Sequence, residues 1–328
     1  MLAMSATLLA GLLSLAAVHT TYLPLPQAPG QRVALHCLVP GQSTRHSVLF
    51  IHGASFPTML AAGFEFAPGD SWLAFMAGRG YLACGLDFVG FGASSRPPAM
   101  AGSGIGMPVS RATDAAAQIA LAVDYLCGIR GMAHVHLVAH SWGTIPAAAY
   151  AAAHPHALAS LTLFGPVTQV AHPQGGPVHG AWWGITAQAR YRQLRYADVL
   201  PPGMALLEPA VDATWAARFD ESVPHVSGDP PGQLRIPSGP LADIDEAQAG
   251  RYPYAADEVR VPVFVVYGDH DTVVGDDAAA EFLARFVASP LRWRLRIDHG
   301  THVMHLERAR RSLYESVDAF IHAAEARR

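Results

Sequence analysis

The segment His-Val-His-Leu-Val-Ala-His-Ser-Trp-Gly, residues 134–143, leads from an apolar run into a serine between two small residues. Ala139 stands two positions before Ser141, and Gly143 stands two positions after it. A serine held in a sharp turn from a strand into a helix requires small residues at these positions, because the strand and the helix pass close to each other there. The pattern predicts a nucleophile elbow, with alanine at the first small position where glycine is commoner.

The residues on both sides of the serine fit such a turn. Before it, Val135, Leu137 and Val138 predict a buried strand. After it, the alanine-rich segment 145–153 predicts a helix that ends ahead of Pro155. The serine is therefore expected at the carboxyl end of a strand.

Apolar runs alternate with helical patterns along most of the chain. Strands are predicted at residues 20–25, 31–39, 48–51, 81–86, 134–139, 159–164, 261–267 and 291–297, the first two as an antiparallel pair. Helices are predicted at residues 71–78, with Asp70 as N-cap, and at 113–129, 145–153, 276–287 and 306–324. This alternation predicts an α/β fold, in which helices cover both faces of a mostly parallel sheet.

The alternation stops between residues 166 and 260, where Pro, Gly, Trp and Tyr become frequent. We expect residues 20–165 and 261–328 to form one core domain and residues 166–260 to form an inserted cap. The aromatic side chains of the cap either line a substrate pocket or pack the cap on the core, and packing is the commoner role of aromatics.

Residues 1–19 form an apolar N-terminal segment of uncertain role. No Lys or Arg precedes its apolar core, since the first basic residue is Arg32, so the charge pattern of a signal peptide is missing. The run is too short for a membrane span. A cleaved signal peptide, an additional helix and a misassigned start remain alternatives. We expect a cytoplasmic protein, or a secreted one if the segment is a signal peptide.

The cysteines and histidines give no sign of a metal site. Cys37, Cys84 and Cys127 lie in or beside apolar segments without a C-x-x-C spacing, which predicts buried free thiols and agrees with a cytoplasmic location. The 17 histidines are scattered and form no H-E-x-x-H or similar motif. We therefore assign no metal.

Composition excludes several other functions. All 22 basic residues are arginine, and the net charge is -4 at pH 7. Without a basic stripe, nucleic acid is not expected as a partner, and without lysine the chain has no Schiff-base or P-loop chemistry. A small molecule is the expected partner, while the sequence does not predict the oligomeric state.

A serine becomes a nucleophile when a base takes its proton and a carboxylate orients that base. Two aspartates, Asp269 and Asp271, follow the strand predicted at 261–267. Three histidines follow the last predicted strand, at positions 299, 302 and 305. The chain order Ser, Asp, His is the order of a nucleophile-elbow hydrolase.

With these motifs the chain resembles the α/β-hydrolase superfamily, from His52-Gly53 through the elbow to the last histidines. The resemblance implies that cap insertion occurs between strands 6 and 7 of the sheet. It also implies a triad of Ser141, Asp271 and His302, because the carboxylate follows the glycine ending strand 7 by three residues and the histidine precedes Glu307 by five. Asp269, His299 and His305 remain the alternatives.

The same resemblance assigns further roles. The backbone N–H groups of Ala54 and Trp142 are implied to form the oxyanion hole. His140 is implied to pack beneath the nucleophile. The segment 87–94, Asp-Phe-Val-Gly-Phe-Gly-Ala-Ser, resembles a structural loop of the superfamily.

The implied activity is that of a serine hydrolase that cleaves an ester-type bond of a small molecule through an acyl-enzyme intermediate, with no cofactor. Serine at the elbow argues against the dehalogenase and epoxide-hydrolase branches, whose nucleophile is aspartate. A carboxylesterase-like enzyme is therefore expected, with carbon–carbon bond hydrolysis and lactone opening as alternatives on the same triad.

Two further alternatives remain. Ser-Trp-Gly also resembles the elbow of proline iminopeptidases, and Asp243, Asp245 and Glu246 offer carboxylates for a substrate amine. Those enzymes carry His-Gly-Gly-Pro-Gly where this chain has His-Gly-Ala-Ser-Phe-Pro at 52–57. The alternative outside enzymology is a ligand sensor on a hydrolase fold. Labelling of Ser141 by a fluorophosphonate distinguishes an enzyme from a sensor.

Overall fold

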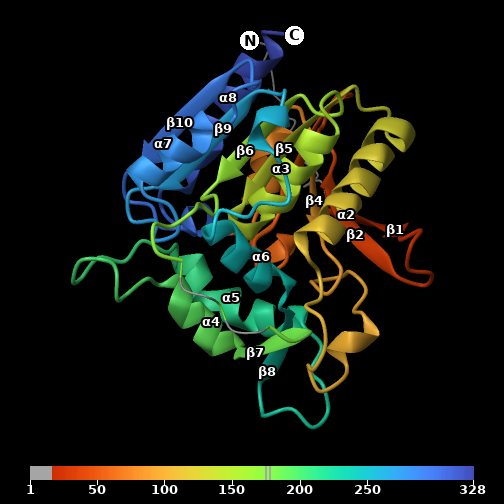
Figure 1. Cartoon of the computed structure of the whole chain (residues 1–328), viewed down its shortest axis with the longest axis vertical. Coiled ribbons are helices and arrows are strands. Elements are labelled where there is room, and N and C mark those ends of the chain that lie inside the picture. The colour runs from red at the N-terminus through yellow and green to blue at the C-terminus, as the bar shows by residue number, and fades with distance from the viewer. Residues whose placement is uncertain (1–16, 174–175, 177–178) are drawn as a thin grey trace, which may run out of the picture.

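A computed structural model describes residues 17–173, 176 and 179–328, so most of the N-terminal segment 1–19 lies outside the described residues. Its centre is an eight-stranded sheet with the order β1-β2-β4-β3-β5-β6-β9-β10 (Figure 1). The strands are β1 (His19–Pro24), β2 (Arg32–Leu38), β3 (His46–Ile51), β4 (Leu82–Asp87), β5 (His134–His140), β6 (Ser160–Phe164), β9 (Val263–Gly268) and β10 (Arg292–Ile297). Pairing is antiparallel from β1 through β2 to β4 and parallel across the rest of the sheet.

Two apolar layers sandwich this sheet. The helices are α1 (Trp72–Gly78), α2 (Ala112–Asp124), α3 (Thr144–Ala153), α7 (Asp276–Ala284) and α8 (Arg310–Glu325). Buried side chains of α1 and α8 pack together with one set of strand side chains, and those of α2, α3 and α7 pack with the other set. The prediction of an α/β fold, with helices on both faces of a mostly parallel sheet, is confirmed.

Two helix starts differ from the prediction. The N-cap of α1 is Ser71, whose hydroxyl accepts a hydrogen bond from the N–H of Ala74 at 3.1 Å. Asp70 instead accepts hydrogen bonds from Arg310 and Arg311 of α8, so its carboxylate is used by a tertiary contact. Residues 304–306 form a separate 3₁₀ turn, and for this reason α8 begins at residue 310 rather than at 306.

The chain between β6 and β9 forms an insertion below the carboxyl ends of the strands in Figure 1. Its elements are β7 (Trp182–Thr186), α4 (Ala187–Leu194), α5 (Pro209–Ser222), β8 (Gln233–Pro237) and α6 (Gly239–Gln248), and β7 and β8 pair as a small antiparallel sheet. The indole N–H of Trp215 on α5 donates a hydrogen bond to the carbonyl of Leu60 at 3.0 Å. Trp215 thus attaches α5 to the core, which is the packing role expected of aromatics in this segment.

The prediction of three buried free thiols is wrong. Cys37 and Cys84 form a disulfide, because β2 and β4 are antiparallel neighbours whose register places these two residues opposite each other. Cys127 is a free thiol and is exposed. Disulfides persist mainly in oxidising compartments, so the cysteines no longer favour a cytoplasmic location.

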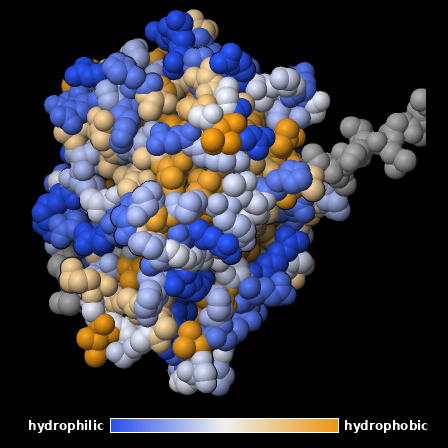
Figure 2. Space-filling model, turned by 90° about the vertical axis from the view of Figure 1, so that its right-hand side faces the viewer, coloured by the Kyte–Doolittle hydropathy of each residue, from blue (hydrophilic) through white to orange (hydrophobic). Residues whose placement is uncertain are grey.

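Apolar side chains also reach the surface. Figure 2 shows them as separate groups among hydrophilic side chains on the face drawn there. Ile105 and Met107 are largely exposed. Among the described residues, no helix combines the length and the apolar character that crossing a membrane requires.

Candidate active site

Ser141 lies where β5 turns into α3, at the start of a 3₁₀ turn that spans Ser141–Gly143. Its φ of 57° is left-handed, a conformation that costs a non-glycine residue roughly 1–2 kcal/mol. The hydroxyl of Thr144 donates to the Ser141 carbonyl at 2.6 Å and helps to hold this turn. A Cβ atom on Gly143 would lie 2.4 Å from the carbonyl oxygen of His52, so only glycine fits there. These contacts explain the small residue after the serine.

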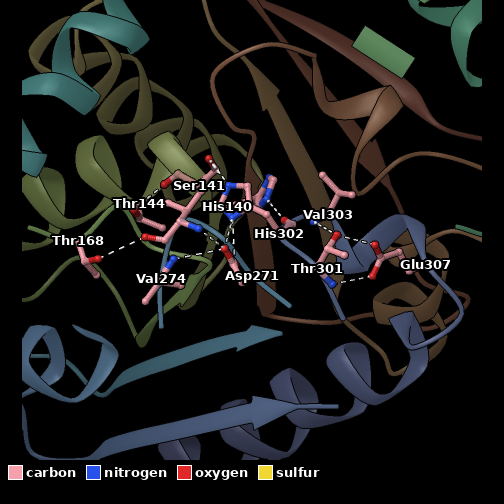
Figure 3. A network of polar contacts seen from close by, with 11 residues as sticks. His140, Ser141, Thr144, Thr168, Asp271, Val274, Thr301, His302, Val303 and Glu307 are labelled. Carbon is pink, nitrogen blue, oxygen red and sulfur yellow. Dashed lines mark hydrogen bonds and ion pairs between the residues drawn. The ribbon is translucent and has the colours of Figure 1, made fainter. Parts of the chain in front are cut away.

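The side chains of Ser141, His302 and Asp271 form one hydrogen-bonded chain (Figure 3). The serine Oγ donates to His302 Nε2 at 2.7 Å, and His302 Nδ1 donates to Asp271 Oδ2 at 3.0 Å. A neutral imidazole protonated at Nδ1 meets both contacts. The three groups are contributed by loops after β5, β9 and β10, so the carboxyl edge of the sheet brings together residues that are far apart in sequence.

Asp271 is held from two sides. Its Oδ1 accepts hydrogen bonds from the backbone N–H groups of Val273 at 2.8 Å and Val274 at 3.3 Å. Gly165, directly after β6, has a φ of 53°, and a Cβ there would lie 2.9 Å from His302 Nδ1 and 3.0 Å from Asp271 Oδ2. Because Gly165 has no side chain, the His302 imidazole and the Asp271 carboxylate have room to meet beside it. The sequence analysis did not indicate this role of Gly165.

The two residues expected to supply the oxyanion hole, Ala54 and Trp142, belong to chain segments next to the serine. A Cβ on Gly53 would be 3.1 Å from the Ser141 Cβ, so the chain carrying Ala54 passes next to the nucleophile. Trp142 N–H belongs to the first residue of the turn after the serine. Within the described part of the chain, no protein acceptor receives a hydrogen bond from the N–H of Ala54 or of Trp142.

A scan against models of protein families matches residues 70–309 to the family described as serine aminopeptidase, S33. The chain belongs to this family. It is a serine hydrolase with the α/β-hydrolase fold. A search of curated proteins finds no match.

Solved structures of this fold resemble the hydrolase over nearly its whole length. A membrane phospholipase A described as a bacterial virulence factor has a TM-score of 0.61 and 18% identity, covering 95% of this chain and 88% of the other. A thioesterase domain from the curacin biosynthetic pathway has a TM-score of 0.59 and 15% identity, covering 93% and 99%. Est1E from Butyrivibrio proteoclasticus, bound to ferulic acid, has a TM-score of 0.57 and 15% identity, covering 93% and 99%. At these identities the likeness shows the shared fold.

The alternative residues at the carboxyl edge of the sheet make other contacts. Asp269 Oδ1 accepts the N–H of Gly300 at 3.0 Å and so holds the loop before His302. His305 is buried behind the site, with its ring centroid 4.6 Å from that of His140, and burial lowers its pKa to about 3. His299 adopts a φ of 58° in the turn after β10. None of the three contacts the Ser141 hydroxyl among the hydrogen bonds of the described residues.

His140 and Asp87 form hydrogen bonds with chain segments next to the site. His140 Nε2 donates to the His302 carbonyl at 2.7 Å, and its ring stacks on Phe164. Asp87 accepts the N–H of Thr58 at 2.8 Å and bonds to His36 Nε2 at 2.9 Å. The Asp87 carboxylate, at the end of β4, thereby links β4 to β2 and to the chain that follows Ala54. The sequence did not indicate that His36 takes part in this link.

Glu307 fixes the loop that carries His302. Its carboxylate accepts hydrogen bonds from the N–H of Thr301 at 2.9 Å and from the Thr301 hydroxyl at 2.5 Å (Figure 3). Burial raises the pKa of Glu307 to about 7, because it outweighs the two hydrogen bonds from Thr301. The backbone next to His302 is therefore held by a carboxyl group, that of Glu307, which titrates near neutral pH.

We expect Glu307→Gln to weaken the pH dependence of stability. The pKa of Glu307 is higher in the folded chain than its ordinary 4.5, so the folded state binds this proton more tightly. Its contribution is complete below pH 4.5 and is lost as pH rises through about 7, a fall of about 3 kcal/mol in the free energy of unfolding. Urea unfolding of both proteins at pH 5 and pH 8 measures the difference. Equal falls in the two proteins would contradict the assignment.

The acidic residues considered for amine binding are already engaged. Asp243 on α6 accepts hydrogen bonds from Arg111 Nε at 2.6 Å, the N–H of Ala112 at 2.6 Å and the indole N–H of Trp142 at 3.0 Å. It thus ties α6 to the first residue of α2 and to the elbow. Asp245 pairs with His179, and Glu246 pairs with Arg251. These contacts give all three carboxylates a structural role.

The insertion also brings a positive charge towards the site. Arg190 on α4 lies over the Phe56 ring, with 5.6 Å from its Cζ to the ring centroid. Burial lowers the pKa of His140 well below its ordinary value, and the neighbouring charges, that of Arg190 among them, act in the same direction. Burial lowers the pKa of Arg190 itself. In the described chain Arg190 forms no ion pair, and the residues outside that description contain no Asp or Glu. No pattern in the sequence around Arg190 predicts that its side chain lies near the site.

Proposed function

We propose that this serine hydrolase cleaves a carboxylic ester of a small molecule through an acyl-enzyme intermediate. The observation that carries the proposal is the continuous hydrogen-bonded chain from Ser141 through His302 to Asp271. Asp271 holds the imidazole in the tautomer whose Nε2 can accept the serine proton, and it stabilises the imidazolium that forms. The segment 166–260 is proposed to act as the cap that covers the substrate.

The first half of the reaction forms the acyl-enzyme. Ser141 Oγ forms a bond to the ester carbonyl carbon while its proton passes to His302 Nε2. The carbonyl oxygen becomes an oxyanion, which the N–H groups of Ala54 and Trp142 stabilise. The bond to the alcohol oxygen then breaks, and the leaving alcohol takes the proton from Nε2.

The second half releases the acid. His302 Nε2 accepts a proton from a water molecule as the water oxygen attacks the acyl carbon. The second tetrahedral intermediate uses the same two N–H donors. Its collapse breaks the bond to Ser141 Oγ, returns the proton to the serine and frees the carboxylic acid.

Aminopeptidase activity is the second candidate, and the description of the family favours it. An aminopeptidase needs an anionic group for the substrate ammonium, but Asp243, Asp245 and Glu246 are paired. Arg190 adds a positive charge on the cap side, which repels an ammonium group. These charges support the ester over an N-terminal amino acid.

A comparison of matched chromogenic substrates tests the proposal. We expect kcat/KM for p-nitrophenyl butyrate to exceed that for proline and alanine p-nitroanilides by at least about 100-fold. N-acetyl-alanine p-nitroanilide is the control, since an aminopeptidase requires the free amine that this compound lacks. Faster cleavage of the anilides than of the ester, lost on N-acetylation, would reject the ester assignment in favour of the aminopeptidase.

A further inference from the structure

A second cluster of polar side chains lies at the opposite end of the sheet from the serine. His46 is the first residue of β3, His136 is the third residue of β5, and Glu325 is the last residue of α8. His136 precedes Ser141 by five residues of extended chain, or about 16 Å. In Figure 1 this end of the sheet lies near the C-terminus, away from the insertion. The cluster therefore has no part in the reaction proposed above.

The three side chains converge on one point. His46 Nδ1 lies 2.6 Å and His136 Nε2 lies 3.1 Å from Glu325 Oε1, and one ligand-type atom from each residue falls within 4.8 Å of the others. Zinc bound at about 2.0–2.2 Å by nitrogen and oxygen atoms holds its tetrahedral ligands about 3.3–3.5 Å apart. The 2.6 Å between His46 Nδ1 and Glu325 Oε1 is shorter than that spacing, so an ion would have to move the half-exposed His46 side chain away from the carboxylate. We propose that His46, His136 and Glu325 bind a divalent transition-metal ion, with Zn²⁺ as the preferred ion.

His136 is oriented as a metal-binding histidine usually is. Its side chain is fully buried, and its Nδ1 is 2.8 Å from the hydroxyl of Ser160 on the neighbouring strand β6. Such a hydrogen bond on the second ring nitrogen fixes the tautomer and the direction of the first. Nε2 is thereby aimed at the carboxylate of Glu325.

The surroundings suit a cation. Glu325 is a carboxylate whose Oε1 faces both imidazoles, so its oxygen and the two ring nitrogens point towards a common space. His322, one turn before Glu325 on α8, has its Nδ1 3.9 Å from Glu325 Oε2 and its Nε2 3.6 Å from Asp318 Oδ1, and it is the candidate fourth ligand. His46 and His322 are partly exposed, which leaves the ion a path from solvent.

The sequence alone does not reveal this site, since its residues are separated by 90 and 189 positions and form no compact motif. The strand register supplies the first contact, because His46 of β3 pairs with His134 of β5 and His136 lies two residues further on the same face. The last turn of α8 supplies the carboxylate. The bound ion would connect the C-terminal helix to two central strands. Because the unfolded chain lacks the assembled site, the ion would stabilise the folded state and not the unfolded state.

Calorimetric titration of the full chain with ZnCl₂, after treatment with a chelator and at pH 7.5, tests the site. We expect one Zn²⁺ per chain, with affinity reduced at least about 100-fold in Glu325→Gln and in His46→Ala. Glu325→Gln keeps the shape of the side chain and His46→Ala changes a half-exposed residue, so neither is expected to unfold the protein. His225→Ala, in an exposed His–Asp pair on the insertion, is the matched control and should bind as the wild type does.

Two further measurements separate this site from the serine site. Zn²⁺ should raise the melting temperature of the wild type but not that of Glu325→Gln, and one equivalent should leave ester hydrolysis within about twofold. The proposal is overturned if the wild type binds no Zn²⁺, or if both ligand variants bind it as tightly as the wild type. Stoichiometric inhibition that persists in Glu325→Gln overturns it too, because the ion then binds at His302.

Discussion

Ser141→Ala is expected to lower kcat/KM for a p-nitrophenyl ester by about 10⁴-fold to 10⁶-fold while leaving the melting temperature nearly unchanged. Alanine removes the Oγ atom that attacks the carbonyl, whereas the two N–H donors stay in place and leave a residual rate. Active-site titration with a fluorophosphonate measures the same loss, since the reagent labels only an activated serine. Labelling of the wild type should be stoichiometric, and labelling of the variant should be absent.

A suitable control is Ser316→Ala on α8, whose hydroxyl donates a hydrogen bond on the exposed side of the helix. Its turnover and labelling should equal those of the wild type. If Ser141→Ala kept the turnover of the wild type, Ser141 would not be the nucleophile. If the wild type failed to react with the fluorophosphonate under native conditions, a ligand-sensing role would replace the enzymatic one.

Asp271→Asn is expected to lower kcat by about 10⁴-fold with little loss of stability. The amide nitrogen of asparagine donates instead of accepting, so it favours the imidazole tautomer with a proton on Nε2, which cannot take the serine proton. The measurement is steady-state ester hydrolysis, together with urea unfolding to confirm that the variant is folded.

Asp269→Asn is the matched control, because Asp269 is the other aspartate of the same loop, two residues before Asp271. It holds the N–H of Gly300 and does not reach His302, so its replacement should cost about tenfold or less. The opposite ranking, with Asp269→Asn inactive and Asp271→Asn active, would assign the orienting carboxylate to Asp269.

Much of the fold could be predicted because its signals are local. The strand and helix around the elbow follow from apolar runs and alanine-rich segments, which report burial and helix propensity directly. The small residue at 143 has a local cause as well, namely the close approach of the His52 carbonyl. The order of serine, aspartate and histidine left two aspartates and three histidines open, and the resemblance to α/β-hydrolases selected Asp271 and His302, which the structure hydrogen-bonds in a chain with Ser141.

The errors and omissions concern contacts between distant segments. Cys37 and Cys84 were interpreted one at a time, but their pairing depends on the β2–β4 register, which no spacing in the sequence reports. Gly165 could not be distinguished from an ordinary loop glycine until His302 and Asp271 were placed beside it. Asp243 was interpreted as a free carboxylate because its three donors come from residues at least a hundred positions away.

The hydrogen bond between Trp142 and Asp243 also defines which part of the insertion is free to move. Trp142 offers its backbone N–H to the proposed oxyanion and its indole N–H to α6, so displacing α6 would pull on the residue that supports the reacting oxygen. The same carboxylate clamps α6 to the start of α2. Helix α6 is therefore fastened to the same residue whose backbone N–H is proposed to stabilise the oxyanion, so a change that loosens α6 should also disturb the reaction.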